Sequence, residues 1–187
     1  MYLSGRGQQR LADGHTDLFP DHDAMHAYAK PGEEIRVVAI LSAVQNCETN
    51  LEKFREEVEK MSQKIGFTYP RGIEVVNAPA DAGVRSHIET FQRLIEKVED
   101  NDKLYACMTY GVKPLSQILI MAIQYAYRLL DNASICCLVY GQPGWGGAAP
   151  SVNDMTALIQ MDEITRLLAE HKVKNPRTVI EKIISQD

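Results

Sequence analysis

The stretch KLYACMTYGVKPL, residues 103–115, decides the fold class of this 187-residue chain. Its first half, residues 103–108, is mostly apolar, as in a strand buried on both faces of a parallel sheet. Its second half is a turn that contains Gly111 and ends at Pro114, and a largely apolar segment follows. Proline is favoured in the first turn of a helix, so we predict a strand, a turn and a central helix in this order.

Similar units lie on both sides of this stretch. Apolar runs predict three further strands, and the segments after them carry apolar residues at helical spacing. Strands that alternate with helices predict an α/β fold with an open, mostly parallel sheet and right-handed crossovers. The further strands are expected at residues 35–41, 72–77 and 134–140, and the helices at residues 49–65, 86–98, 115–130, 154–169 and 176–184.

Several helix ends carry capping patterns. Thr49 with Glu52, and Ser86 with Glu89, have the spacing of a capping box. Gly66 is expected to end the first long helix, because glycine readily adopts the left-handed conformation of a C-cap. These patterns predict where two of the helices begin and where one ends.

Composition excludes several classes of protein. Hydrophobic residues make up 45% of the chain and charged residues 24%, which are globular values, and the net charge is −5. A basic surface for duplex nucleic acid is therefore not expected. The longest apolar stretch, residues 115–126, is too short and too polar to span a membrane, and the first residues lack the apolar core of a signal peptide. We expect a cytoplasmic protein whose four cysteines are reduced.

We interpret the whole chain, residues 1–187, as a single domain. Residues 1–4 are a candidate first strand. Residues 9–34 are polar and broken by proline and glycine, and we interpret them as a long excursion with a helical turn near Asp23 to Tyr28. Residues 1–34 thus form a variable N-terminal part, and residues 170–187 form a helical tail.

Polar, glycine-containing turns follow several predicted strands, and ligands of open α/β sheets bind beyond the carboxyl ends of the strands. After residues 103–108, Thr109 supplies a hydroxyl, Gly111 lets a backbone approach closely, and Lys113 adds a positive charge beside a helix N-terminus. This group suits a phosphate or a ribose, and an ordinary turn is the alternative. The same alternatives stand for Ser4-Gly5-Arg6-Gly7-Gln8, Ser42-Ala43-Val44-Gln45-Asn46 and Tyr140-Gly141-Gln142.

Other chemistry finds less support in the sequence. A Walker A motif, a GxGxxG fingerprint, a GxSxG elbow and a CxxC pair are all absent. His22 and His26 have the spacing of two metal ligands on a helix, but we interpret them as part of a solvated loop. Asp154 is interpreted as a helix cap rather than as a catalytic acid. We expect neither a metal ion nor a cofactor.

The residues quoted so far bear a family resemblance. The motif at residues 105–115 resembles the central motif of CARF domains, the CRISPR-associated Rossmann-fold sensors of cyclic oligoadenylate. Residues 124–127, 138–142 and 154–158 follow in the order and spacing of one CARF subgroup, and residues 50–54 resemble its first long helix. The resemblance covers residues 35–169 and, more loosely, residues 2–7. Met108 departs from it, because the subgroup usually has an aspartate there.

The resemblance implies a Rossmann-like, open sheet with helices on both faces, that is, a three-layer sandwich. It also implies a homodimer that holds the ligand across its twofold axis. Cyclic tetra-adenylate is expected first and cyclic hexa-adenylate next, since rings of fourfold and sixfold pseudo-symmetry fit such an axis. The ligand contacts that it implies come from Ser4, Gly5, Arg6, Gly7, Gln8, Ser42, Ala43, Gln45, Asn46, Thr109, Tyr110, Gly111, Lys113, Pro114, Tyr140, Gly141 and Gln142.

Two functions follow from the resemblance. The first is a sensor that regulates an effector of a type III CRISPR antiviral system, with residues 170–187 leading toward that effector in a longer chain. The alternative is a stand-alone, metal-independent ring nuclease, which places a ribose 2′-OH in line with its phosphate. Such cleavage needs positioning and charge stabilisation, for which Thr109 and Lys113 are the candidates.

Overall fold

The computed structural model describes residues 21–43, 46–80, 83–109, 112–142 and 151–185. The chain divides into two compact units, Met1–Met155 and Thr156–Asp187. The sequence predicted one domain with a tail from residue 170. The second unit instead begins at Thr156, at the start of the helix Thr156–Glu170 that precedes this tail. The candidate strand at residues 1–4 lies outside the described residues.

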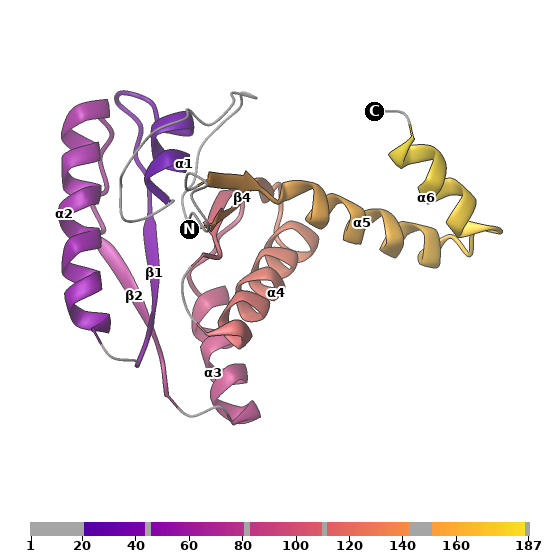
Figure 1. The fold of residues 1–187 in the computed structure, drawn as a ribbon, viewed down its shortest axis with the longest axis horizontal. Helices are drawn as coiled ribbons and strands as arrows, with labels where there is room; N and C mark the ends of the chain where they lie inside the picture. Colours follow the sequence, from indigo (N-terminus) through magenta and orange to yellow (C-terminus); the bar gives the residue numbers. More distant parts are fainter. Residues whose placement is uncertain (1–20, 44–45, 81–82, 110–111, 143–150, 186–187) are drawn as a thin grey trace, which may run out of the picture. The chain divides into compact units, whose positions relative to one another are not determined.

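Helices and strands alternate along the first unit (Figure 1), so the predicted Rossmann-like α/β fold class is confirmed. The second unit is helical. The elements of the first unit are α1 (Asp21–Tyr28), β1 (Val37–Ser42), α2 (Cys47–Ile65), β2 (Ile73–Ala78), α3 (Val84–Ile95), β3 (Lys103–Cys107), α4 (Lys113–Leu129), β4 (Ser134–Gln142) and β5 (Ser151–Asp154). Those of the second unit are α5 (Thr156–Glu170) and α6 (Pro176–Ile184).

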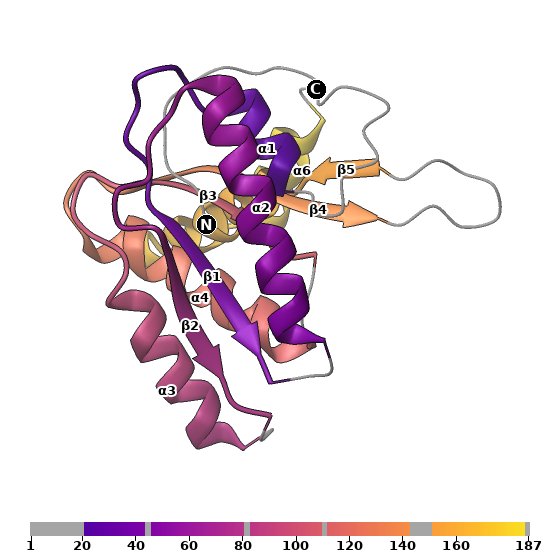
Figure 2. The ribbon, with the colours of Figure 1, turned by 90° about the vertical axis from the view of Figure 1, so that its left-hand side faces the viewer.

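The described strands form two separate hydrogen-bonded ladders, one with two strands and one with three. β1 and β2 pair in parallel, from Val37 opposite Ile73 to Ser42 opposite Ala78. β3 pairs in parallel with β4, and β4 pairs antiparallel with β5. Between the described parts of β1 and β3 there is no ladder, although a single sheet was expected. Figure 2 shows that β1 and β2 run in a different direction from β4 and β5.

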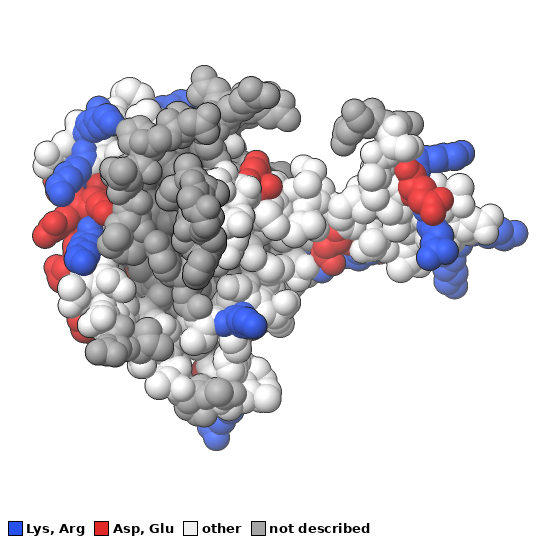
Figure 3. All heavy atoms as spheres, in the orientation of Figure 1, with Lys and Arg blue, Asp and Glu red and all other residues white. Residues whose placement is uncertain are grey.

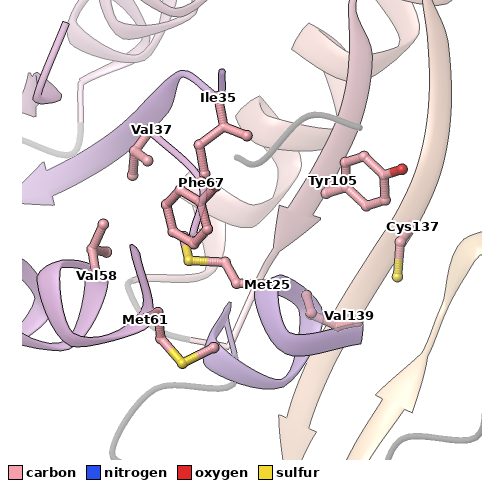
Figure 4. Packing of buried hydrophobic residues seen from close by; sticks show 10 residues of the cluster. Met25, Ile35, Val37, Val58, Met61, Phe67, Tyr105, Cys137 and Val139 are labelled. Carbon is pink, nitrogen blue, oxygen red and sulfur yellow. The ribbon is translucent and has the colours of Figure 1, made fainter. Parts of the chain in front are cut away.

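Side chains join these ladders instead of backbone hydrogen bonds. Met25 of α1 belongs to a buried cluster with Phe67, which precedes β2, and with Tyr105 of β3 and Val139 of β4 (Figure 4). The rings of Tyr28 and Tyr105 lie 5.0 Å apart between their centroids. The first unit thus has a continuous core, and α1 is part of it.

Helices cover both faces of the strands. Figure 1 shows α2 on one side of β1 and β2, and α3 and α4 on the other side. α1 packs against α2, α3 packs against β2, and α4 packs against β4. β1 and β2 are parallel and are connected through α2, as the predicted alternation of strands and helices requires.

The structure corrects both capping boxes. α2 begins at Cys47, two residues before Thr49, with Asn46 as its N-cap in the left-handed conformation and without a side-chain hydrogen bond. α3 begins at Val84 after Gly83, so Ser86 lies inside the helix. Thr49 and Ser86 therefore lie inside their helices, although such residues are favoured at N-caps. The C-terminal prediction is confirmed, because Gly66 has a φ of 89° and donates its N–H to the Ser62 carbonyl.

Two predictions about β4 and its surroundings were wrong. Asp154 ends β5 instead of capping a helix, and α5 begins at Thr156. Gly141 was expected to open a loop but belongs to β4. The ladder register shifts so that Leu104 pairs with Ile135 and Tyr105 pairs with Cys137, which leaves Cys136 as an extra residue. Such a bulge interrupts the regular alternation of side chains along the strand.

A network of ion pairs lies near the amino ends of β1 and β3. The guanidinium of Arg36 donates to Asp102, to Glu99 at 2.7 Å and to the Lys97 carbonyl at 3.1 Å. Only 11% of the Arg36 side chain and 13% of the Asp102 side chain are exposed. Arg71 also contacts Glu99, at 2.9 Å. This network connects β1 to the turn before β3.

Helices long and apolar enough to cross a bilayer are absent from the ranges that the structure describes.

Candidate functional site

The carboxyl ends of β3 and β4 meet at Thr109. The Gly141 N–H donates a hydrogen bond of 2.7 Å to the Thr109 hydroxyl oxygen. The Met108 N–H donates to the Val139 carbonyl at 3.0 Å, so the backbone also holds the two strand ends together. The Thr109 hydroxyl lies 3.0 Å from the Cys107 thiol. Two of the sequence-predicted turns are therefore in direct contact.

α4 begins beside these strand ends with an open N-terminus. Val112, in extended conformation, is its N-cap, and no side chain accepts a hydrogen bond there. Lys113 is the first helical residue and Pro114 follows in the first turn, both exposed to solvent. Pro114 has no N–H, and the Leu115 N–H donates to the Val112 carbonyl at 2.9 Å, so the first turn leaves the Lys113 N–H as a donor. This N–H, the positive end of the helix dipole and the Lys113 ammonium favour an anion at such a place.

The third predicted turn follows β1. Ser42 ends this strand and is half-buried, and the Ala43 N–H donates to the Ala78 carbonyl at 3.1 Å. Asn46 is exposed at the start of α2 with a φ of 66°. This turn is tied to the end of β2, and no hydrogen bond between described residues links Ser42 or Ala43 to Thr109.

Residues at the carboxyl end of β4 alternate between exposed and buried. Gly141 is buried, whereas Tyr140 and Gln142 on either side of it are exposed. β5 holds this end, with Asn153 opposite Tyr140 and Ser151 opposite Gln142. The remaining site predictions, Ser4, Gly5, Arg6, Gly7, Gln8, Gln45, Tyr110 and Gly111, lie outside the described residues.

Sequence reasoning missed two residues near the strand ends. Arg93 of α3 donates to the Asn77 carbonyl at 2.9 Å and so brings a guanidinium near the carboxyl end of β2. Cys107 contacts the Thr109 hydroxyl, as described above. The prediction for α3 used only its apolar residues, and Arg93 is not one of them. Cys107 was interpreted as a residue of the apolar core.

Tyr28 of α1, a helix that packs against β4, has a perturbed pKa. Burial, which is the largest cause, the charge of Cys137 and a hydrogen bond with it, and the nearby Asp154 and Cys136 together raise the pKa of Tyr28 to about 12. None of the four cysteines forms a disulfide. The fold therefore favours the neutral phenol of Tyr28.

We expect this tyrosine to make stability depend on alkaline pH. Its ordinary pKa is about 10, so its contribution is fully present below about pH 10 and is lost as the pH rises toward about 12. Chemical unfolding of the wild type and of Tyr28→Phe across this range checks the effect. The wild type should lose more stability than the variant, and parallel losses would contradict it. Tyr69, whose pKa is also raised to about 12, titrates in both proteins and cancels.

Groups of three or more His, Cys, Asp or Glu side chains placed to hold a metal ion do not occur among the described residues. Of the histidine pair that the sequence suggested, the side chain of His22 is not among the described ones. The chain was also compared with models of known protein families and with curated proteins. No family model and no curated protein matches it.

Proposed function

We propose that this chain binds a cyclic oligoadenylate at the carboxyl ends of its strands, as a homodimeric sensor that regulates a type III CRISPR effector. The ligand class comes from the resemblance of residues 105–115 and the motifs that follow them. Cyclic tetra-adenylate is the first candidate and cyclic hexa-adenylate the second.

One observation carries the proposal: the hydrogen bond from the Gly141 N–H to the Thr109 hydroxyl. It joins two of the polar turns that the sequence singled out, although 32 residues separate them. The N-cap of α4, Val112, comes three residues after Thr109 in the sequence and makes no side-chain capping hydrogen bond. A phosphate group of the ligand finds the Lys113 N–H, the helix dipole and the Lys113 ammonium there, so a chain of net charge −5 needs no broadly basic surface.

Thr109 has a double role in this proposal. Its oxygen already accepts the Gly141 N–H, so one of its two lone pairs is committed to the protein. The contact with the Cys107 thiol uses either the hydroxyl proton or the second lone pair, so one of the two remains for a ligand. We infer that Thr109 mainly positions the end of β4 and that Lys113 supplies the charge.

Calorimetric titration with cyclic tri-, tetra- and hexa-adenylate tests the function. Saturation at one intact ring per two chains, with the products checked by mass spectrometry, is the expected result. Linear products would instead identify the ring nuclease that is the alternative. Failure of all three rings to bind would refute the proposed ligand class.

Variants at α4 test the site. We expect Lys113→Ala to weaken ring binding by about 1–3 kcal/mol, because a charge-assisted contact with phosphate is lost. Lys103→Ala is the matched control, since this exposed lysine lies at the opposite end of β3 and should not alter the affinity.

Thr109→Val should weaken binding by a similar amount, about 1–3 kcal/mol, because the buried Gly141 loses its acceptor. Thr109→Ser keeps the hydroxyl and should retain affinity. Unchanged affinity in both Lys113→Ala and Thr109→Val would exclude this site.

A further inference from the structure

The Thr109 hydroxyl contacts two groups of the protein, which come from neighbouring strands. The Gly141 N–H of β4 donates to the Thr109 hydroxyl oxygen at 2.7 Å. The thiol of Cys107, the last residue of β3, lies 3.0 Å from the same oxygen, and either atom can be the donor of this contact. The direction of this second hydrogen bond decides what Thr109 can offer to a ligand.

The fold holds Cys107 and Thr109 in place. Cys107 pairs with Val139 in the ladder of β3 and β4, and it packs against the buried core cluster of the first unit. The Met108 N–H donates to the Val139 carbonyl at 3.0 Å, so the pairing continues past the end of β3. Side chains two residues apart on extended backbone share a face, which is why the thiol and the hydroxyl can meet. The positions of both groups are therefore set by the ladder.

The two possible directions leave different groups for a ligand. A hydroxyl has one proton to donate and two lone pairs with which to accept, and the Gly141 N–H occupies one lone pair of Thr109. If the Cys107 thiol donates to the second lone pair, the hydroxyl proton remains available. If the hydroxyl donates to the sulfur, only a lone pair remains available.

The chemistry of the acceptors favours the thiol as the donor. Sulfur is a weak acceptor, whereas a phosphate oxygen is charged and accepts strongly. A hydroxyl proton within reach of a phosphate oxygen, or of water, therefore leaves the sulfur, and the thiol then gives its own proton to Thr109. The opposite direction would bring a lone pair of Thr109 against an anionic oxygen, and two acceptors repel each other.

The mixed charges of the first unit give single donors more weight in holding an anion. On the face shown in Figure 3, the Lys and Arg side chains over α2 lie among Asp and Glu side chains. The whole chain has a net charge of −5. A phosphate group at the end of β3 thus depends on well-oriented donors rather than on a broad positive field.

We propose that Cys107 is a positioning residue of the ligand site, whose thiol donates to Thr109 and so directs the Thr109 hydroxyl proton toward an anionic oxygen of the ligand. This inference rests on the proposed function, to which it adds a residue and the kind of ligand group that Thr109 contacts. Cys107 acts through Thr109 and does not itself touch the ligand. Thr109 both holds the end of β4 and donates to a phosphate oxygen.

Infrared spectroscopy of the full chain without ligand tests the direction of the hydrogen bond. The S–H stretching band lies where other protein groups absorb little, and a thiol that donates a hydrogen bond absorbs at a lower frequency than one that does not. The Cys107 band, taken as the difference between the wild type and Cys107→Ala, should move to higher frequency in Thr109→Val and stay in place in Thr109→Ser. A band that does not move in Thr109→Val would overturn the proposal.

Calorimetric titration with cyclic tetra-adenylate tests the effect on binding. Cys107→Ala should raise the dissociation constant about 3- to 10-fold, which is the range for one neutral hydrogen bond, whereas Cys107→Ser keeps a donor and should stay within about 2-fold of the wild type. Cys136→Ala is the matched control and should leave the affinity unchanged. Its thiol is also half-buried and packs against the same core cluster from the neighbouring strand.

Double variants show whether Cys107 acts through Thr109. Cys107→Ala should weaken binding by less than about 2-fold in the Thr109→Val background but should have its full effect in the Lys113→Ala background. Equal effects in both backgrounds would make the role of Cys107 purely structural and would overturn the proposal, as would wild-type affinity in Cys107→Ala. If no ring bound the wild type, the proposed function and the ligand part of this inference would fail together, and the infrared shift would still decide whether the thiol donates to Thr109.

Discussion

Replacing Asp102 by alanine should lower the free energy of unfolding by about 3–5 kcal/mol, because the largely buried Arg36 guanidinium loses its buried partner and keeps only the exposed Glu99 and the Lys97 carbonyl. Asp102 also accepts the Glu99 N–H at 2.7 Å, so the turn before β3 loses a backbone contact as well. Urea denaturation measures the effect. A loss of this size is a large part of the stability of an ordinary domain.

Two comparisons sharpen this experiment. Glu89→Ala removes exposed pairs with Arg85 and Arg93 and should change stability by at most about 0.5 kcal/mol. The double variant Arg36→Met/Asp102→Leu removes both charges together and should be more stable than Asp102→Ala, since no buried charge is left alone. If Asp102→Ala lowered the free energy of unfolding as little as Glu89→Ala does, the ion-pair network would not stabilise the fold.

The second large effect is expected at α1. Met25→Ala should cost about 2–5 kcal/mol, the usual range for a methionine truncated in a packed core. Met25 is 2% exposed and belongs to the cluster with Phe67 and Tyr105. Thermal and urea unfolding of the full chain check this value.

The matched variants for this position separate packing from helix formation. Met25→Leu nearly conserves the volume and should cost less than about 1.5 kcal/mol. Lys30→Ala, at an exposed position just after α1, should stay within about 0.5 kcal/mol of the wild type. A small loss of unfolding free energy in Met25→Ala would show that α1 packs on the rest of the first unit without stabilising it.

Buried runs and glycine stops made most of the fold predictable from the sequence. Residues 103–107 form β3 as expected, and α4 follows, because apolar runs and a proline at a helix start are local signals. Gly66 ends α2 for the same reason, since its positive φ is a local requirement. These local patterns were confirmed, whereas the two capping boxes, which are also local, placed the starts of α2 and α3 too late.

Features set by distant contacts were harder to predict. β5 has four residues and no strong periodicity, so only its pairing with β4 reveals it. The polar sequence of α1 hides two buried residues, Ala24 and Met25. The bulge at Cys136 arises from the register against β3. In the candidate site, the turns at Thr109 and Gly141 were predicted separately, but their hydrogen bond needed the parallel pairing of β3 with β4.

The way in which the described strands divide into two ladders has a mechanical consequence. Backbone bonds fix the register within each ladder, whereas packing of side chains such as Met25 and Phe67 connects the two. Apolar packing is non-directional, and methionine adapts its shape easily. We therefore expect that small rotamer changes at this apolar joint shift the ladders without breaking ladder bonds, while the Arg36 ion pairs hold the amino end of β1 to the turn before β3. The turn after β1 and the turn after β3 lie on opposite sides of this joint, so a ligand that contacts both would set its angle.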